Sequence, residues 1–226
     1  MVWQSPEGID EYLKPTPLCD SDDEEIKKKA RELIKGVTAP KEAALNIFYF
    51  VRDEIKYALD FVDVRASHTL KTRLGTCEHK SKLQIALLRA GGIPARYRRA
   101  ATRKELLRGI FSGIIYRGIP EVPDTHVWCE CYLSGKWVSC DALLDKVLFE
   151  GMVRRRFPAA SQIPTIDWDG QNNLILTKPW VVEDFGAFAS LDDLWIEVAK
   201  KEAAPRILQR IAMSLSNRHT DNLRRR

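Results

Sequence analysis

Apolar residues recur at helical spacing in two segments near the start of the chain. The first, "SDDEEIKKKARELIKG", has Ser21 as an N-cap, acidic residues in its first turn and Gly36 as a stop. The second opens after Thr38, with Pro40 at its start, and continues through "KEAALNIFYFVRDEI". Its apolar stripe consists of Ala44, Ile47, Phe48 and Val51. The pattern predicts two amphipathic helices that bury one face each.

A third helix is predicted in "GTCEHKSKLQIALLRAGG", where Cys77 follows a glycine and a threonine. Thr76 is a suitable N-cap, and Gly91 and Gly92 are suitable residues to end the helix. Its apolar residues are consistent with one buried face, made of Leu83, Ala86, Leu87 and Ala90. This segment therefore places a cysteine at a helix N-terminus.

Alternating apolar and polar residues predict strands in the middle of the chain. From Thr125 to Asp141, "THVWCECYLSGKWVSCD" shows two alternating stretches around Ser134 and Gly135, the pattern of a β-hairpin. Before it, "IPARYRRAAT" predicts a strand after Pro94, and "RKELLRGIFSGIIYRG" predicts a short, interrupted helix.

Both ends of the chain carry weaker patterns. The first twenty residues hold three prolines and are expected to form an irregular arm that packs through Trp3, Tyr12 and Leu13. In the C-terminal third, "DWDGQNNLIL" indicates a loop and a strand. A helix follows from about Leu191 to Ala203, Pro205 breaks it, and a last helix runs towards Ser216. We expect a single domain over residues 1–226.

The hairpin register decides which side chains share a face. In the first strand His126, Trp128, Glu130 and Tyr132 point one way, and Val127, Cys129, Cys131 and Leu133 point the other. With the turn at Ser134 and Gly135, Tyr132 faces Trp137. His126 and Asp141 then become diagonal neighbours on one face, about 7–8 Å apart at the backbone. A carboxylate there can orient an imidazole and stabilise its charged form.

The amino-acid composition limits the classes of protein to which this chain can belong. The chain has 226 residues, of which 45 % are hydrophobic and 30 % charged, as in ordinary globular proteins. The net charge of +5 includes a basic C-terminal tail and gives little support to nucleic-acid binding. No apolar run is long enough to cross a bilayer, and the N-terminus lacks the features of a signal peptide, so a cytoplasmic location is expected. The five cysteines are then expected to be reduced.

Cys77 has two readings at this point. A thiol attacks as the thiolate, and a helix N-terminus lowers the thiol pKa through its amides and dipole. Gly75 would allow close approach of a substrate backbone, and the Cys77 amide could help to hold an oxyanion. Alternatively, a lone cysteine is a buried small hydrophobe. A nucleophile also requires a base and a group that orients the base, and the hairpin offers both.

Metal sites receive less support than a nucleophile does. A zinc site from His126, Cys129, Cys131 and Cys140 would need ligands from both faces of the hairpin, and no Cys-x-x-Cys knuckle is present. The stretch "DWDGQNN" invites a calcium reading but lacks the later glutamate of an EF-hand loop. We therefore expect the three hairpin cysteines to be core and this stretch to be a solvated turn, with no metal and no cofactor.

Several polar residues compete with this assignment or extend it. His79 lies two residues after Cys77, so it points away from the thiol and is expected at the surface or rim. His68 and His219 are expected to be bystanders, and Asp124 ranks behind Asp141 as the partner of the base.

Other side chains could support the site. Trp128 shares a face with His126 and either shields the histidine–carboxylate pair or is structural, whereas Trp137 packs in the core or beside the site. Tyr57 and Thr72 are open candidates for a second oxyanion donor.

Two segments together resemble the transglutaminase-like superfamily of papain-like cysteine enzymes. They are "GTCEHKSKLQIALLRAGGIPARYR" and "THVWCECYLSGKWVSCD". The shared features are a Gly-x-Cys that opens a helix, a Gly-Ile-Pro-Ala-Arg turn, a His-x-Trp strand and a Trp-x-x-x-Asp strand. The similarity is greatest to prokaryotic transglutaminase-like proteins and covers about residues 40 to 145. It implies Cys77 as nucleophile, His126 as general base and acid, and Asp141 as the orienting carboxylate.

The resemblance implies an α+β fold, in which the helix bearing the cysteine packs on an antiparallel sheet. An N-terminal arm and helix (1–39) and a C-terminal extension (146–226) add helices at both ends. The expected chemistry is acyl transfer at amide bonds through a thioester, with hydrolysis first, on a peptide, protein or small amide. A protein-glutamine transamidase and a catalytically silent binding domain are the alternatives. No nucleic-acid or membrane partner is expected, and no pattern indicates an oligomeric state.

Overall fold

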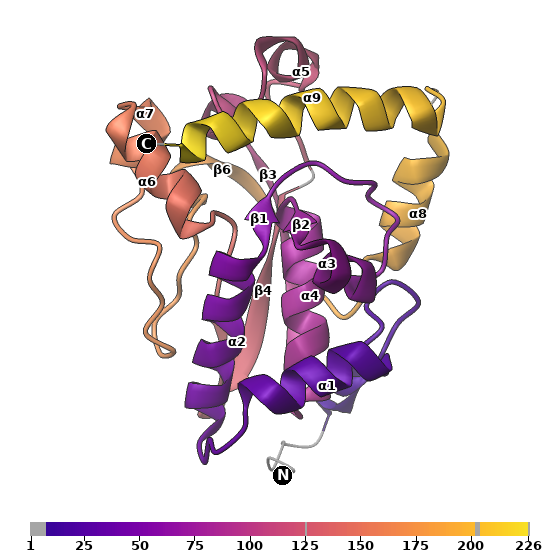
Figure 1. Cartoon of the computed structure of the whole chain (residues 1–226). Coiled ribbons are helices and arrows are strands. Elements are labelled where there is room, and N and C mark those ends of the chain that lie inside the picture. Colours follow the sequence, from indigo (N-terminus) through magenta and orange to yellow (C-terminus); the bar gives the residue numbers. More distant parts are fainter. Residues whose placement is uncertain (1–7, 125, 202–203, 226) are drawn as a thin grey trace.

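A curled antiparallel sheet carries the hairpin in this computed structural model, which describes residues 8–124, 126–201 and 204–225 (Figure 1). The strand order is β5-β4-β3-β6. The bounds are Ala95–Thr102 for β3, His126–Leu133 for β4, Lys136–Ser139 for β5 and Val181–Phe188 for β6. All three pairings are antiparallel, so the fold is α+β as predicted.

Helix α4 (Cys77–Ala90) packs on one face of this sheet, against β4 and β3. Three helices contact α4 in turn: α1 (Glu24–Leu33), α2 (Pro40–Glu54) and α3 (Ala66–Thr72). Two short strands, β1 (Lys56–Tyr57) and β2 (Leu74–Gly75), pair in parallel, and β2 leads directly into the helix that carries Cys77. The cysteine-bearing helix is therefore the centre of the packing.

The remaining elements flank this centre. Three short 3-10 helices are η1 (Asp10–Leu13), η2 (Lys104–Leu107) and η3 (Lys178–Trp180). The other helices are α5 (Gly113–Gly118), α6 (Lys146–Arg154), α7 (Pro158–Ser161), α8 (Asp192–Lys201) and α9 (Arg206–Arg224). Figure 1 shows α9 along one end of the molecule, where it contacts α6. In the described part of the chain, no helix has the length and apolar character needed to span a bilayer.

The predicted hairpin is confirmed in its turn and its register. Ser134 and Gly135 both have positive φ, 51° and 84°, as a two-residue type I′ turn requires. Tyr132 lies opposite Trp137, which is the predicted pairing. Trp137 packs edge-on against Tyr12 of the N-terminal arm, with ring centroids 4.9 Å apart. Trp3, the other aromatic residue predicted to anchor this arm, lies outside the described residues.

Some predicted boundaries are wrong. Asp23, not Ser21, caps α1, because its carboxylate accepts hydrogen bonds from the amides of Glu25 and Ile26. Helix α9 continues past Ser216 to Arg224. The strand predicted in "DWDGQNNLIL" reduces to one bridge between Leu174 and Cys140. The predicted end of α8 at Ala203 lies outside the described residues.

Several described elements had no counterpart in the sequence prediction: β1, α3, β2, α6, α7, η3 and β6. Strand β6 lies at the sheet edge, half-buried or exposed along its length, and its pairing with β3 contains two register shifts. The regular alternation that identifies a strand is consequently absent there.

Helix α4 is buried all round, whereas the sequence predicted one buried face. Lys80 and Lys82 are only 1 % and 0 % exposed. The ammonium of Lys80 donates to the carbonyls of Arg52 (3.1 Å) and Ile55 (2.6 Å), at the end of α2. That of Lys82 donates to the carbonyls of Val62 (3.1 Å) and Val64 (2.7 Å). The two lysines thereby satisfy carbonyls that would otherwise be buried without partners.

The start of α4 is fixed by a reciprocal cap. Thr76 is the N-cap, as predicted, and its hydroxyl accepts from the amide of His79 while Nδ1 of His79 accepts from the Thr76 amide at 3.3 Å. Nε2 of His79 lies 2.9 Å from the carbonyl of Phe61. His79 is fully buried, so its predicted place at the surface is wrong: the cap and the Phe61 carbonyl supply partners for both ring nitrogens.

Gly75 is needed for this cap. A Cβ added at Gly75 would lie 2.4 Å from the Cβ of His79, which is too close for any side chain. The glycine of the Gly-x-Cys motif is thus required for close packing against His79. This requirement adds to the access for a substrate backbone that the sequence suggested.

We expect Gly75→Ala to destabilise the protein by about 1–3 kcal/mol, because the new methyl group must displace His79 from the cap. Urea denaturation measures the change. Gly113→Ala is the matched control, since a Cβ at Gly113 meets nothing within 4 Å. Equal stability of Gly75→Ala and the control would contradict this account of the cap.

Lys80 supplies a prediction about pH. Burial lowers the pKa of Lys80 to about 8, although the nearby Asp145 carboxylate opposes the shift. Between that pH and the ordinary lysine pKa the unfolded chain holds a proton that the folded chain has lost, so the Lys80 contribution to stability increases with pH. The unfolding free energy of the wild type should therefore rise relative to Lys80→Met by about 1 kcal/mol per pH unit in this window.

Chemical denaturation at a series of pH values measures this difference. Lys28→Met, at a side chain 71 % exposed, is the control. A difference between the wild type and Lys80→Met that stays constant or falls from pH 8 upwards would show that Lys80 keeps its proton in the fold.

Candidate active site

Cys77 and His126 line the same cavity. Its volume is about 190 Å³, and its walls are mainly apolar, formed by Leu59, Leu106, Leu107, Phe111, Ile119 and Leu143. Cys77 is the first residue of α4 and is half-buried, and His126 is the first residue of β4. The contact of α4 with β4 thus brings together two side chains that lie 49 positions apart in sequence.

Asp141 lies behind His126, as the hairpin register predicted. Its Oδ2 is 3.8 Å from Nε2 of His126, within ion-pair range but longer than a hydrogen bond. Both residues are nearly buried, with 6 % and 2 % exposure. The carboxylate is held by the backbone amides of Leu143 and Leu176, each 3.1 Å away. Asp141 is therefore fixed by the backbone independently of the histidine.

Trp128 covers one face of the His126 ring. The two rings are stacked, with centroids 5.7 Å apart and an interplanar angle of 27°. The indole Nε1 donates to the hydroxyl of Ser139 at 3.0 Å, and that hydroxyl donates to Glu130 at 3.2 Å. Trp128 is 3 % exposed, so an anchored indole separates this side of the imidazole from water.

The surroundings of Cys77 oppose ionisation of its thiol. Burial, first, and then the adjacent Glu78 carboxylate raise the pKa of Cys77 well above its ordinary value, while the backbone of Val127 opposes them. The predicted lowering of the Cys77 pKa by the helix N-terminus is therefore wrong here, because burial and a neighbouring anion outweigh the helix amides.

The other polar candidates lie elsewhere or have other partners. Asp124 pairs with Arg99 at 2.9 Å and its side chain is 63 % exposed, so the structure does not bring it to His126 as an alternative partner. The hydroxyl of Thr72 donates to the carbonyl of His68 and does not line the cavity. Tyr57 does line the cavity and is 3 % exposed.

The two histidines expected to be bystanders contact other groups. Nε2 of His68 pairs with Asp60 at 3.0 Å, and Nε2 of His219 lies 3.0 Å from the carbonyl of Gly109. Neither histidine lines the cavity of Cys77.

The cysteines of the hairpin lie on the face of the sheet opposite His126. Cys129, Cys131 and Cys140 are fully buried, and the sulfurs of Cys131 and Cys140 are 3.8 Å apart. This is the core position that the register predicted. In "DWDGQNN", Asp169 accepts hydrogen bonds from the amides of Gln171 and Asn172, both at 2.8 Å, which closes a compact turn. Across the described ranges, no cluster of three or more His, Cys, Asp or Glu side chains has the arrangement of a metal site.

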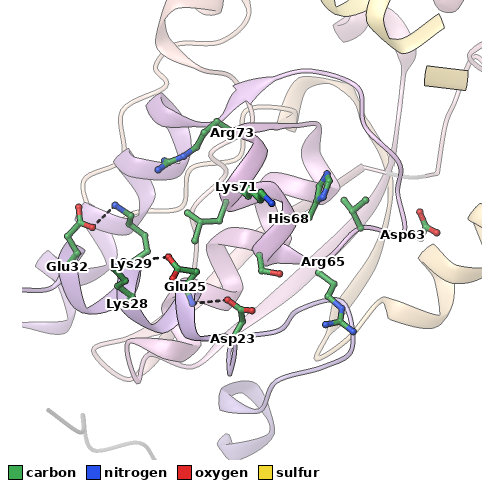
Figure 2. Close-up of a pocket in the computed structure, with 13 residues that line it drawn as sticks. Asp23, Glu25, Lys28, Lys29, Glu32, Asp63, Arg65, His68, Lys71 and Arg73 are labelled. Carbon is green, nitrogen blue, oxygen red and sulfur yellow. Dashed lines mark hydrogen bonds and ion pairs between the residues drawn. The ribbon is translucent and has the colours of Figure 1, made fainter. Parts of the chain in front are cut away.

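A larger hollow, of about 960 Å³, lies between α1 and α3 (Figure 2). Charged side chains dominate its walls, and several are already paired, including Lys29 with Glu32 at 2.6 Å and Lys28 with Glu25 at 3.8 Å. Its described lining contains no cysteine. The smaller cavity therefore holds the reactive groups.

Sequence reasoning missed two contributors to the site. Glu78 was not singled out, although its position next to Cys77 was a signal for it. The amide of Leu176 comes from a segment 35 positions after Asp141, and no local pattern indicates that contact.

One solved structure shares the fold of this chain. A structure of a protein from Cytophaga hutchinsonii, provisionally assigned as a cysteine protease, superposes with a TM-score of 0.54 at 21 % identity, over 84 % of this chain and 50 % of that chain. The chain thus spans half the length of this neighbour. A protein from Parabacteroides distasonis, provisionally assigned as a protease, gives a TM-score of 0.39 at 17 % identity, over 58 % of this chain and 25 % of that one.

Sequence comparison gives the family. No curated protein matches the chain at a significant level. A sequence profile, however, matches residues 27–142, which contain Cys77, His126 and Asp141. That profile describes the transglutaminase-like superfamily, and the chain belongs to this family.

Proposed function

We propose that this protein catalyses cysteine-dependent acyl transfer at amide bonds, with Cys77 as nucleophile, His126 as general base and acid, and Asp141 as the orienting carboxylate. One observation carries the proposal: Cys77 and His126 line one cavity, and Asp141 lies 3.8 Å behind the imidazole. Because Nε2 of His126 faces Asp141, the other ring nitrogen, Nδ1, is left to accept the proton of the thiol.

The proposed reaction begins from the protonated thiol. The sulfur attacks the carbonyl carbon of the amide while His126 takes the thiol proton, which gives a tetrahedral oxyanion. His126 then donates that proton to the leaving amine as the C–N bond breaks, and a thioester with Cys77 remains. Water or a second amine attacks the thioester and restores the thiol.

Two groups are candidates for the donor to the oxyanion. The amide of Cys77 lies at the N-terminus of α4, and Tyr57 lines the same cavity. Burial raises the pKa of Tyr57 well above its ordinary value, so its hydroxyl keeps its proton and can donate. Between the two side chains considered from the sequence, the geometry favours Tyr57 over Thr72.

Hydrolysis is the preferred outcome of the thioester. It requires only that water reaches the cavity, whereas transamidation must bind an acceptor amine and exclude water. The fold shared with a provisionally assigned cysteine protease agrees with this choice. Transamidation of glutamine side chains is the second candidate. The alternative of a silent binding domain is less favoured, because the nucleophile, base and carboxylate are all present.

Alkylation tests the proposed roles of Cys77 and His126. Iodoacetamide should label Cys77 before the other four cysteines, which are fully buried. In His126→Ala this labelling should slow at least about tenfold, because a base that assists proton loss is gone. Peptide mapping by mass spectrometry follows each thiol, and His68→Ala, at a histidine outside the cavity, is the control. Equal rates in wild type and His126→Ala would remove His126 from the mechanism.

Product analysis separates the two acyl transfers. With glutamine-containing peptides, we expect hydrolysis products and no incorporation of an added primary amine, because hydrolysis requires only that water reaches the thioester, whereas transamidation must also bind the amine. Mass spectrometry of the peptides, with and without the amine, makes the measurement, and Cys77→Ala is the blank. Stable incorporation of the amine would favour the transamidase instead.

A further inference from the structure

Glu78 is a charged group in the cavity that the proposed mechanism does not use. Its side chain is 18 % exposed, and its Oε2 accepts a hydrogen bond from the thiol of Cys77 at 3.1 Å. Among the described residues that line the cavity, Glu78 is the sole carboxylate, and the lining contains neither lysine nor arginine. The negative charge nearest to the thiol therefore comes from this side chain.

The surroundings keep Glu78 ionised. Oε1 lies 3.4 Å from Nδ1 of His79, beside the cap of α4. Burial acts to raise the pKa of Glu78, but nearby His79, Thr76 and the Cys77 thiol together lower it below its ordinary value. An anion among apolar walls is poorly hydrated, so it attracts a cation and repels another anion more strongly than an exposed carboxylate does.

We propose that Glu78 makes this cavity selective for substrates that carry a positive charge, an ammonium or a guanidinium, close to the reacting carbonyl. The cation of the substrate pairs with the Glu78 carboxylate. The carboxylate then releases its hydrogen bond with the thiol, and the thiol proton becomes available to His126. Glu78 thus couples recognition of the substrate to release of the nucleophile.

This inference depends on the proposed function only for the identity of the reacting thiol. It concerns the charge of the ligand, whereas the proposed function concerns the role of His126. The two can therefore fail separately.

Charge-matched thiol reagents test the proposal. Cationic 2-aminoethyl methanethiosulfonate and anionic 2-sulfonatoethyl methanethiosulfonate both form a mixed disulfide with the attacking thiolate and expel methanesulfinate. The rate at which the cationic reagent modifies Cys77 is divided by the rate for the anionic reagent. This ratio is then divided by the same ratio measured for 2-mercaptoethanol. It is measured at about pH 8, where an ordinary histidine is neutral. We expect a normalised ratio of about ten or more in the wild type.

Variants of Glu78 test whether this side chain causes the preference for the cationic reagent. Glu78→Gln should lower the normalised ratio at least about fivefold, and Glu78→Asp, which keeps the charge, should retain most of it. Glu105→Gln is the control, because Glu105 is exposed on η2 next to the lining residue Leu106 and does not itself line the cavity. Thermal unfolding shows whether each variant is folded.

Two results would overturn the proposal. If the wild-type protein shows a ratio close to that of 2-mercaptoethanol, this measurement alone overturns the proposal. A folded Glu78→Gln protein that keeps the wild-type ratio would also overturn it. In a His126→Ala background the absolute rates report on the proposed function, whereas the charge ratio still reports on Glu78.

Discussion

Burial of α4 on all sides from His79 to Arg89 is the constraint from which the rest of this structure follows. A helix with a sheet on one side and three helices around the rest has no solvent-exposed face for its polar residues. The two lysines in its first turns must therefore find carbonyl partners, and they find them at the end of α2 and in the 62–64 loop. Those contacts tie neighbouring segments to the helix that carries Cys77.

Local patterns predicted the parts of the fold that depend on local chemistry. The Ser134–Gly135 turn and the alternation on either side of it determine the register, and this register is sufficient to predict Asp141 as a neighbour of His126 on one face of the hairpin. A threonine cap and a pair of glycines likewise predicted where α4 begins and ends. His79 and Lys80 were different, because their burial depends on Phe61, Arg52 and Ile55, whose positions no spacing reveals. Strand β6 was missed because an edge strand with irregular pairing lacks alternation.

Segments beyond the matched residues 27–142 complete the candidate site. The Leu176 amide holds Asp141. From α9, Asn217 makes reciprocal hydrogen bonds of 2.7 and 2.9 Å with the backbone of Leu59, a wall of the cavity, and Arg224 donates to the carbonyl of Tyr57 at 2.9 Å. The family region supplies the side chains that we propose to be catalytic, and the C-terminal region helps to fix the walls around them. Differences between relatives in this second region would then alter the cavity without changing Cys77.

The distribution of the five thiols has a practical consequence. Four sulfurs are sealed in the core, and one lines the cavity. A reagent that reaches Cys77 samples the folded protein, whereas one that reaches Cys19 or the three hairpin cysteines must await an opening of the core. The native chain therefore contains two built-in probes, one of the cavity and one of core stability, and a single mass-spectrometric experiment can follow both in the same sample.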